Sequence, residues 1–244
     1  MRRALSFLTP LGGAADAAPS ALTWFPVVGA IIGLVVGAAW WGAGQVWAAS
    51  AAAGIAVLAD AALTGMLHLD GLADAADGLL PPLPRARRLD VMADPRIGAF
   101  GAAALVTIML VRFGAFTAAR PSPLAVAGLW SGSRTAMAVT AVTVPYARPG
   151  GLAAGFLRSP GAPAGIKAGR FRAAVITLIG APLAVGLALA GRGVQGVAAV
   201  SAETVVAIAV VCLGWRRLGG FTGDVLGAAA VTAETAGLLV LAWR

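Results

Sequence analysis

Charged residues are scarce in this chain of 244 residues, and their scarcity excludes an ordinary water-soluble fold. They make up 11% of the sequence, against 59% hydrophobic residues. A soluble domain carries about a quarter charged residues, because it must cover its surface with polar groups. A lipid bilayer is the solvent that suits this composition. Length alone allows one or two domains, but helices that cross one membrane normally pack together, so we expect a single integral membrane domain over residues 1–244.

Cysteine and histidine occur only once each, which limits the available chemistry. Cys212 lies inside an apolar run, so an intrachain disulfide is impossible and a packing role is expected. The N-terminus starts with two arginines and a short apolar stretch, which imitates a secretory signal. The stretch is only five residues long, whereas such a signal needs about 7–15 apolar residues. We therefore expect no cleaved leader.

The excess of basic over acidic residues has a topological explanation. The formal net charge is +8, which on a soluble protein would suggest nucleic acid as a partner. Here the basic residues are scattered between apolar runs, as in the short cytoplasmic loops of inner-membrane proteins. We expect membrane lipid and no nucleic acid as a partner, in the inner membrane of a bacterium. Whether the chain forms a homo-oligomer is left open.

Apolar runs of membrane-spanning length alternate with polar loops. A spanning helix needs roughly 20 mostly apolar residues, and the chain offers seven candidates. They predict an all-α membrane bundle of about seven transmembrane helices, with six to eight as the range. The second candidate is expected to continue as helix through Leu80, past the membrane surface. The candidates are Pro26–Trp47, Ala49–Leu67, Gly98–Ala118, Pro123–Val144, Ala173–Ala190, Val194–Gly214 and Val225–Trp243.

The distribution of basic residues predicts the orientation. With a cytoplasmic N-terminus, 13 basic residues lie on the cytoplasmic side and three on the other. Because cytoplasmic loops carry the excess of Lys and Arg, we expect this orientation. It places three active-site segments in the cytoplasm, residues 64–101, 145–172 and 215–227. The 13 basic residues are Arg2, Arg3, Arg85, Arg87, Arg88, Arg96, Arg148, Arg158, Lys167, Arg170, Arg172, Arg216 and Arg217.

The segment after the second candidate span carries an acidic cluster, Asp70, Asp74 and Asp77. Their spacing of i, i+4 and i+7 places the carboxylates within a roughly 60° arc of one helix face. Like charges so placed repel one another, and a divalent cation compensates them, since Mg²⁺ typically takes one or two carboxylates plus substrate phosphates. A solvated acidic helix end is the alternative. We prefer a metal-assisted phosphoryl-transfer site.

His68, the single histidine, precedes the acidic cluster. Its reference pKa of ~6.5 suits a general base that takes a proton from an attacking hydroxyl. A structural role, in which it forms a hydrogen bond at the membrane interface or orients Asp70, explains its position equally well. Both interpretations stand.

Three further polar segments adjoin predicted spans. In the first, Asp94 is a candidate N-cap or metal ligand, and Arg96 is a candidate phosphate ligand through its planar guanidinium. Arg148 marks either a plain turn or another phosphate contact. In Arg216–Asp224, paired arginines stand beside flexible glycines at a helix start, as in an anion-binding loop. A membrane anchor followed by an Asp cap is the alternative there.

Five charged residues fall inside predicted spans: Asp60, Arg112, Arg134, Glu203 and Glu234. Such charges usually face the bundle interior, where they mark function or pair with one another. Arg134 is the best candidate for reaching into a substrate cavity. For Arg112, snorkelling to the surface is the simple alternative, and a pair between Asp60 and an arginine would be structural. The sequence indicates no partner for Glu203 or Glu234.

Taken together, the polar segments resemble the cobalamin synthase family, the adenosylcobinamide-GDP ribazoletransferases. The matching motifs follow the family's order, and the resemblance covers nearly the whole chain. The most specific motif is Thr64-Gly-x-x-His68-Leu-Asp70-Gly-Leu-Ala-Asp74-x-x-Asp77-Gly78. The others are Asp94-x-Arg96-Ile-Gly98-Ala-Phe-Gly101, Ser133-Arg134, Tyr146-Ala-Arg148-x-x-Gly151 and Arg217-Leu-Gly219-Gly220-x-Thr222-Gly223-Asp224-x-Leu-Gly227. The early stretches Phe7-Leu8-Thr9 and Trp24-Phe25-Pro26-Val-Val-Gly29 also fit.

This resemblance implies a transferase of substituted phosphate groups that acts late in cobalamin biosynthesis. It would join adenosylcobinamide-GDP to α-ribazole, or to α-ribazole 5′-phosphate, and release GMP, with Mg²⁺ as the cofactor. The implied catalytic residues are His68, Asp70, Asp74 and Asp77, and the implied Mg²⁺ ligands are Asp70, Asp74, Asp77 and Asp94. The implied substrate-binding residues are Arg96, Arg134, Arg148, Arg216, Arg217, Thr222 and Asp224.

Two other functions compete with this one. A CDP-alcohol phosphotransferase also carries aspartates at helical spacing on a membrane helix. Its pattern needs an Ala-Arg pair soon after the first Asp pair, whereas Asp77 is followed here by Gly78-Leu-Leu-Pro-Pro. A transporter would place its functional charges near the middle of the membrane, whereas the acidic cluster lies at the predicted surface.

Overall fold

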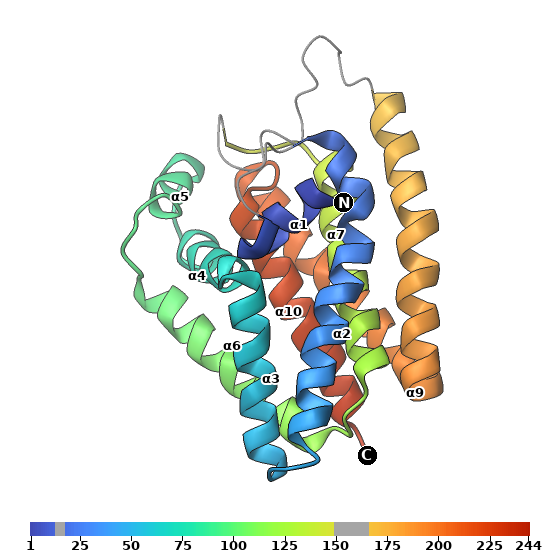
Figure 1. The fold of residues 1–244 in the computed structure, drawn as a ribbon. Coiled ribbons are helices and arrows are strands. Elements are labelled where there is room, and N and C mark those ends of the chain that lie inside the picture. The colour runs from blue at the N-terminus through green and yellow to red at the C-terminus, as the bar shows by residue number, and fades with distance from the viewer. Residues whose placement is uncertain (13–17, 149–165) are drawn as a thin grey trace.

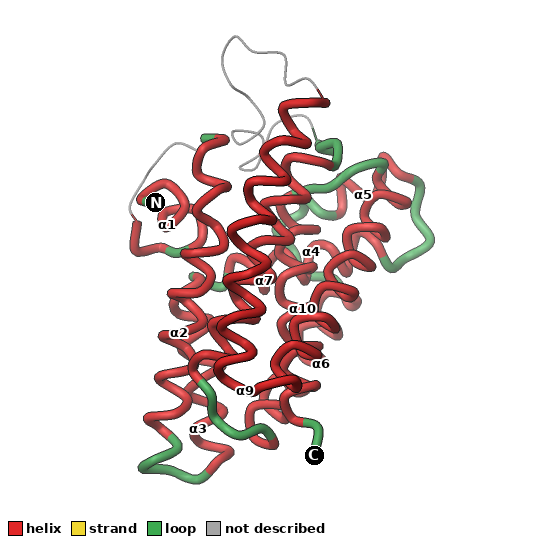
Figure 2. The backbone as a smooth tube through the Cα atoms, turned by 90° about the vertical axis from the view of Figure 1, so that its right-hand side faces the viewer, coloured by secondary structure: helices red, strands yellow, loops and turns green. Residues whose placement is uncertain are grey.

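A computed structural model describes residues 1–12, 18–148 and 166–244, and α-helices make up most of these ranges (Figure 1). The longer helices run side by side and form one bundle (Figure 2). Within the described residues, β-structure is limited to one isolated bridge between Tyr146 and Phe221. The predicted all-α fold is confirmed. The helices are α1 (Arg2–Leu8), α2 (Phe25–Ala43), α3 (Ala49–Thr64), α4 (Leu67–Leu79), α5 (Arg85–Val91), α6 (Ala99–Ala118), α7 (Pro123–Thr143), α9 (Ile166–Leu218) and α10 (Gly223–Ala242), with 3₁₀ turns at Pro10–Gly12 and Pro19–Trp24.

Each predicted span coincides with a long helix or with one arm of α9. Of the described helices, four are long and apolar enough to cross a membrane, and α3 taken together with α4 would make a fifth. α7 is not among them, although it occupies the predicted span after Ser122. It carries several hydroxyl side chains and packs against α2, α9 and α10, so its surroundings are largely protein. The membrane helix bundle expected from composition is thus confirmed.

The long helix α9 is folded into a hairpin. Its backbone leaves helical geometry at Arg192 and at Gly193, where φ is 58°, a left-handed value that glycine adopts at no steric cost. Beyond this break, the second arm packs so closely on the first that a Cβ atom on Gly196 would collide with the carbonyl oxygen of Ala188. The two arms of this hairpin correspond to the two predicted spans Ala173–Ala190 and Val194–Gly214.

A sharp bend separates α3 from α4. Gly65 and Met66 both have left-handed backbone angles, with φ of 58° and 60°, and the two helix axes differ by 88°. α4 therefore lies across the end of the bundle instead of continuing along it (Figure 1). The predicted continuation as helix is confirmed up to Leu79, but as the separate helix α4, because Gly65 and Met66 interrupt the helix after Thr64.

Small residues let the central helices approach closely. α2 crosses α7 along Gly29 and Gly33, and a Cβ atom on Gly33 would lie 2.7 Å from the carbonyl oxygen of Val126. Close backbone approach at glycine is typical of helices that associate within membranes. α7 is thereby held at the centre of the bundle, between α2, α9 and α10.

Four charged side chains form a buried ion cluster between α3, α6, α7 and α10. Arg112 Nη2 lies 3.1 Å from Asp60 Oδ2 and 2.8 Å from Glu234 Oε2, and Arg134 also pairs with Glu234. Trp130 Nε1 donates a hydrogen bond to Asp60 Oδ1 at 2.8 Å. Arg112 is only 1% exposed, so it pairs and does not snorkel. Arg134, expected in a substrate cavity, is held by Glu234 instead.

Candidate active site

A cavity of about 280 Å³ lies where α4, α10 and the N-terminal helix α1 meet, and we call it the α4–α10 cavity. Its wall is partly apolar and aromatic, and partly made of polar side chains from the sequence motifs. The lining residues are Phe7, Leu67, His68, Asp70, Gly71, Met137, Tyr146, Arg148, Gly223, Asp224, Leu226 and Gly227. Residues from the matching motifs that begin at Thr64, Tyr146 and Arg217 therefore meet at one place.

Two glycines bring α4 against α10. A Cβ atom on Gly71 would lie 3.1 Å from the Cα of Asp224, and one on Gly227 would lie 3.2 Å from the Cα of His68. These distances are shorter than ordinary van der Waals contact, so a larger residue at either position would push the helices apart. The crossing places His68 and Asp70 of α4 beside Asp224 of α10.

Three carboxylates influence one another at this crossing. Asp74 is half-buried, and burial together with the nearby charges of Asp224 and Asp70 raises its pKa to about 7. Asp70 and Asp224 both line the α4–α10 cavity. Asp224 was expected as a substrate contact, and the structure places it close enough to two residues of the acidic cluster to repel them electrostatically.

The same three carboxylates fit a hard divalent cation in their chemistry. Each offers only oxygen ligands, and their mutual repulsion is the condition that a cation relieves. In the described ranges, no three His, Cys, Asp or Glu side chains are arranged closely enough to enclose a metal by themselves. A cation here would therefore also draw on substrate phosphates, as Mg²⁺ commonly does.

Asp77, the third member of the acidic cluster, has a separate structural task. Its Oδ2 accepts a hydrogen bond from the backbone N–H of Gly98 at 2.7 Å, and its Oδ1 accepts one from Gly101 at 2.9 Å. Both residues lie at the start of α6. Asp77 is still close enough to Asp74 to raise the pKa of that carboxyl group, but it does not line the α4–α10 cavity, and its hydrogen bonds run to α6.

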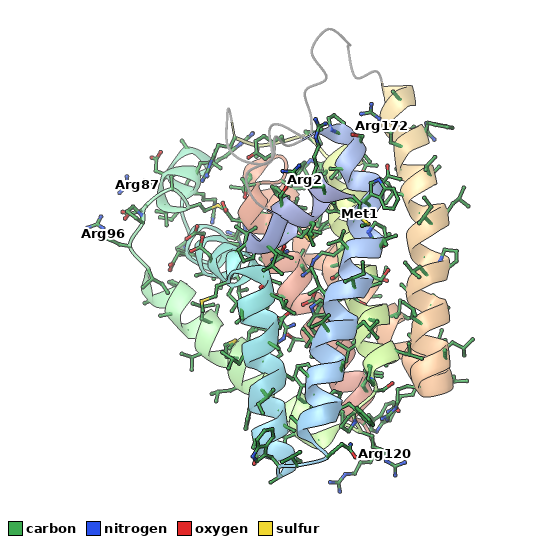
Figure 3. The ribbon with its side chains drawn as sticks, viewed as in Figure 1. Met1, Arg2, Arg87, Arg96, Arg120 and Arg172 are labelled. Carbon is green, nitrogen blue, oxygen red and sulfur yellow. The ribbon has the colours of Figure 1, made fainter. Side chains whose placement is uncertain are left out.

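Asp94 and Arg96 form a pair in the loop before α6. Arg96 donates from Nη2 to Asp94 Oδ2 at 2.7 Å and from Nε to Oδ1 at 3.0 Å. The guanidinium of Arg96 holds the pKa of Asp94 down at about 2. Arg96 points away from the bundle (Figure 3). Asp94 does not cap α6, whose N-cap is Gly98, and the structure does not bring it to the α4–α10 cavity.

His68 is buried at the wall of the α4–α10 cavity. It is 3% exposed, and neither of its ring nitrogens has a hydrogen-bond partner. A buried polar atom without a partner loses the full solvation of that group. Burial and the nearby charges of Arg134 and Arg112 lower the pKa of His68 well below its usual value, so the imidazole is neutral. Both roles expected for His68, general base and structural residue, stay predictions.

Backbone hydrogen bonds of an isolated β-bridge hold the Tyr146–Arg148 segment beside Phe221, just before α10. The backbone N–H of Ala147 donates to the carbonyl of Phe221 at 2.8 Å, and that of Phe221 donates to Pro145 at 2.9 Å. Arg148 Nη2 then lies 3.9 Å from Asp224 Oδ2. Residues 149–165 of the expected active-site segment 145–172, including Arg158, lie outside the described residues, and residues 166–172 begin α9.

The remaining motif residues take other positions. Thr222 is the N-cap of α10: its Oγ1 accepts from the backbone N–H of Val225 at 3.3 Å and donates to Asp224 Oδ2 at 3.2 Å. It thus positions Asp224. Arg216 and Arg217 are exposed in the last turn of α9 and do not line the α4–α10 cavity.

Phe7 is one of the lining residues, with Met137 and Leu226, that the sequence did not assign to the site. It belongs to α1, stacks on Phe25 with ring centroids 5.8 Å apart, and reaches the cavity from the far end of the sequence. Its one signal was its place in the early Phe7-Leu8-Thr9 stretch, which fits the family resemblance but carries no chemistry of its own.

Comparison with known proteins places the chain in a family. The family model for cobalamin-5-phosphate synthase matches residues 1–242. An adenosylcobinamide-GDP ribazoletransferase of Chlorobaculum tepidum is 36% identical, over 98% of this chain and 92% of that protein. Those of Bradyrhizobium diazoefficiens and Roseiflexus sp. are 37% and 33% identical, over 99% and 98% of this chain and 92% and 87% of the relatives. No solved structure is significantly similar. The chain belongs to the cobalamin-5-phosphate synthase family.

Proposed function

We propose that this chain is an adenosylcobinamide-GDP ribazoletransferase, which joins adenosylcobinamide-GDP to α-ribazole or its 5′-phosphate and releases GMP. The family and its named relatives support the reaction. The single structural observation that carries the proposal is the α4–α10 cavity, in which His68, Asp70 and Asp224 from two distant motifs lie together. A transporter would need its functional charges deep in the bundle, whereas four of the five charged side chains predicted there pair with one another in the buried ion cluster and Glu203 alone is buried outside it.

The reaction exchanges a phosphoanhydride bond for a phosphate ester bond. A ribose hydroxyl of the acceptor attacks the phosphorus on the cobinamide side of the pyrophosphate, and the bond to GMP breaks. His68 accepts the hydroxyl proton, because a neutral imidazole offers one ring nitrogen as an acceptor. The protein mainly positions the two substrates and offsets the phosphate charge.

Mg²⁺ is the cofactor that the site residues fit. Asp70, Asp74 and Asp224 would hold it, and Asp77 would contribute only by fixing α4 to α6. When bound, the ion supplies charge neutralisation for the pyrophosphate. Arg148 supplies positive charge at the same cavity from the protein itself.

The active-site end of the bundle is proposed to face the cytoplasm of a bacterial inner membrane. Arg2, Arg87 and Arg172 lie toward one end of the bundle, whereas Arg120 lies at the opposite end (Figure 3). This segregation agrees with the excess of basic residues on the cytoplasmic side of membrane proteins. Exposed apolar side chains on α6 and α9, such as Leu110 and Leu178, support contact with lipid.

The test is an assay of the purified chain in lipid or detergent with adenosylcobinamide-GDP, α-ribazole and Mg²⁺. We expect GMP release together with the corresponding cobamide, and a loss of about 100-fold or more in Asp74→Asn. Asp90→Asn is the matched control, because Asp90 is exposed on α5 and pairs only loosely with Arg87. Release of CMP from a CDP-alcohol would favour the rival phosphotransferase. Full activity of Asp74→Asn would remove the proposed metal role.

A further inference from the structure

A second cavity, of about 550 Å³, lies at the end of the bundle that carries Arg120, opposite to Arg2 and Arg87 (Figure 3). It is formed by the end of α2, the loop between α6 and α7, and the turn within the α9 hairpin. We call it the Arg120 cavity. Its polar lining and its one aromatic side chain are Arg120, Ser122, Arg192, Gln195 and Trp41.

Two arginines bring uncompensated positive charge to the Arg120 cavity. Arg120 and Arg192 are 72 residues apart in the sequence, yet both line it. None of the described acidic side chains lines this cavity, and neither arginine forms an ion pair within the described residues. These two are among the three basic residues predicted on the non-cytoplasmic side, where membrane proteins carry few. Their meeting at one cavity indicates an anion supplied from outside the chain.

The guanidinium of Arg192 is fixed in place without being neutralised. Its Nη1 donates to the carbonyl oxygen of Arg120 at 3.1 Å, and its Nη2 donates to Gln195 Oε1 at 2.5 Å and to the carbonyl oxygen of Leu241 at 3.3 Å. All three acceptors are uncharged. A guanidinium has five N–H groups, so donors remain for a ligand. α7 also begins here, with Ser122 as its N-cap, and the first turn of a helix adds partial positive charge.

Exposed tryptophans place the Arg120 cavity at the level of lipid headgroups. Trp41 at the cavity, Trp47 after α2 and Trp243 after α10 are all exposed. The turn between α2 and α3 and the C-terminus lie at this end of the bundle (Figure 1). Tryptophan is enriched at the two interfaces between membrane and water. The cavity is therefore within reach of phospholipid headgroups.

Apolar side chains continue from the cavity along the two helices that border it. Leu34 lies seven residues before Trp41, on the same face of α2, and is exposed. On α9, Val185 and Leu189 are exposed just before the hairpin turn. A ligand that carries a phosphate and acyl chains contacts both the arginines and this apolar surface, whereas free phosphate contacts only the arginines.

We propose that the Arg120 cavity binds the headgroup of an acidic phospholipid, with its phosphate between Arg120 and Arg192 and its acyl chains along α2 and α9. Arginine binds phosphate through several charge-assisted hydrogen bonds, and basic pockets between membrane helices take acidic headgroups. A zwitterionic headgroup brings a cation of its own, which the two arginines repel. The bound lipid ties together α2, the start of α7 and the α9 hairpin. This site is independent of the proposed reaction.

The experiment compares two lipids that differ in headgroup charge. The purified chain in detergent is titrated with phosphatidylglycerol or phosphatidylcholine, and native mass spectrometry measures the affinity for the first lipid bound. We expect phosphatidylglycerol to bind about tenfold or more tightly than phosphatidylcholine. Arg120→Gln should weaken phosphatidylglycerol about tenfold and phosphatidylcholine less than about twofold. This variant should fold, because the guanidinium of Arg120 is exposed and forms no hydrogen bond with the described residues.

Arg244→Gln is the matched control, since it removes one charge at the same end of the bundle from a residue that does not line the cavity. It should weaken phosphatidylglycerol by less than about twofold. Equal weakening by Arg120→Gln and Arg244→Gln would show a diffuse attraction and overturn the site, as would equal affinities of the wild type for the two lipids. Displacement of phosphatidylglycerol by millimolar inorganic phosphate would assign the cavity to a free anion and overturn the lipid. None of these measurements depends on GMP release, so they test the lipid site separately from the proposed function.

Discussion

Asp77 accepts a hydrogen bond at 2.7 Å from the backbone N–H of Gly98, 21 residues further along the chain. The first N–H groups of a helix have no partner within the helix, and a negative charge near them is favourable. Asp77 therefore does for α6 what an N-cap side chain usually does, but from a different helix. The contact fixes the angle between α4, which carries the site, and the membrane helix α6.

Gly101→Ala should loosen this contact. An added Cβ would collide with Asp77 Oδ2 and would lie 2.8 Å from the carbonyl oxygen of Ala73. We expect a loss of about 1–3 kcal/mol in the free energy of unfolding, typical of overpacking, measured by thermal unfolding in detergent. Gly114→Ala on the same helix is the control, since nothing lies within 4 Å of its added Cβ. Equal effects of the two changes would contradict the prediction.

Glu234→Gln should destabilise the bundle from its interior. The change leaves Arg134 without its charged partner and Arg112 with Asp60 alone. Removing one member of a buried ion pair typically costs about 3–5 kcal/mol, because the other charge stays buried without compensation. Thermal unfolding in detergent measures this, with Asp90→Asn as an exposed comparison that should not change the midpoint. A Glu234→Gln protein as stable as the wild type would show that the cluster is dispensable.

The requirement for Mg²⁺ should depend on pH. The pKa of Asp74 is raised to about 7 in the absence of metal, so the carboxyl group is mostly protonated below that pH and a proton competes with the cation. For one displaced proton, the Mg²⁺ concentration for half-maximal activity should rise about tenfold from pH 8 to pH 6. Mg²⁺ titrations of GMP release at several pH values measure this. A constant half-maximal concentration would argue against Asp74 as a ligand.

Arg148→Ala should discriminate between the two forms of the acceptor. Arg148 lines the α4–α10 cavity and lies 3.9 Å from Asp224. A guanidinium there favours an acceptor that carries a phosphate. We expect the KM for α-ribazole 5′-phosphate to rise about tenfold and that for α-ribazole by less than about twofold. Arg172→Ala, exposed near the same end of the bundle (Figure 3), is the control. Equal changes for both acceptors would refute a phosphate contact.

The sequence was sufficient for the long helices and for the break within α9, but not for the bend between α3 and α4. The apolar runs predicted α2, α6, α7 and α10 closely, because spanning length and composition are local properties. The bend after α3 was missed, since a left-handed conformation at Met66 is not a local preference of methionine. It depends on contacts that form only in the folded bundle.

The site was predicted in part, for a related reason. Helical spacing correctly placed Asp70, Asp74 and Asp77 on one helix, but spacing cannot say which neighbour each carboxylate meets. Asp77 meets α6, whereas Asp74 comes close to Asp224 of α10. Likewise, Arg134 is drawn into the buried ion cluster by Glu234, 100 residues away. Pairings of this kind follow from tertiary packing.

The bend between α3 and α4 makes the site sensitive to chain length. An α-helix turns by about 100° per residue, so deleting one residue ahead of Leu67 rotates α4 about its own axis by that amount. Gly71 would then no longer face Gly227, and the carboxylates of Asp70 and Asp74 would turn away from Asp224. Gly65 and Met66 thus fix how α4, which carries the candidate site, is rotated about its own axis relative to α3. Insertions should be tolerated in the neighbouring loops but not between these two helices.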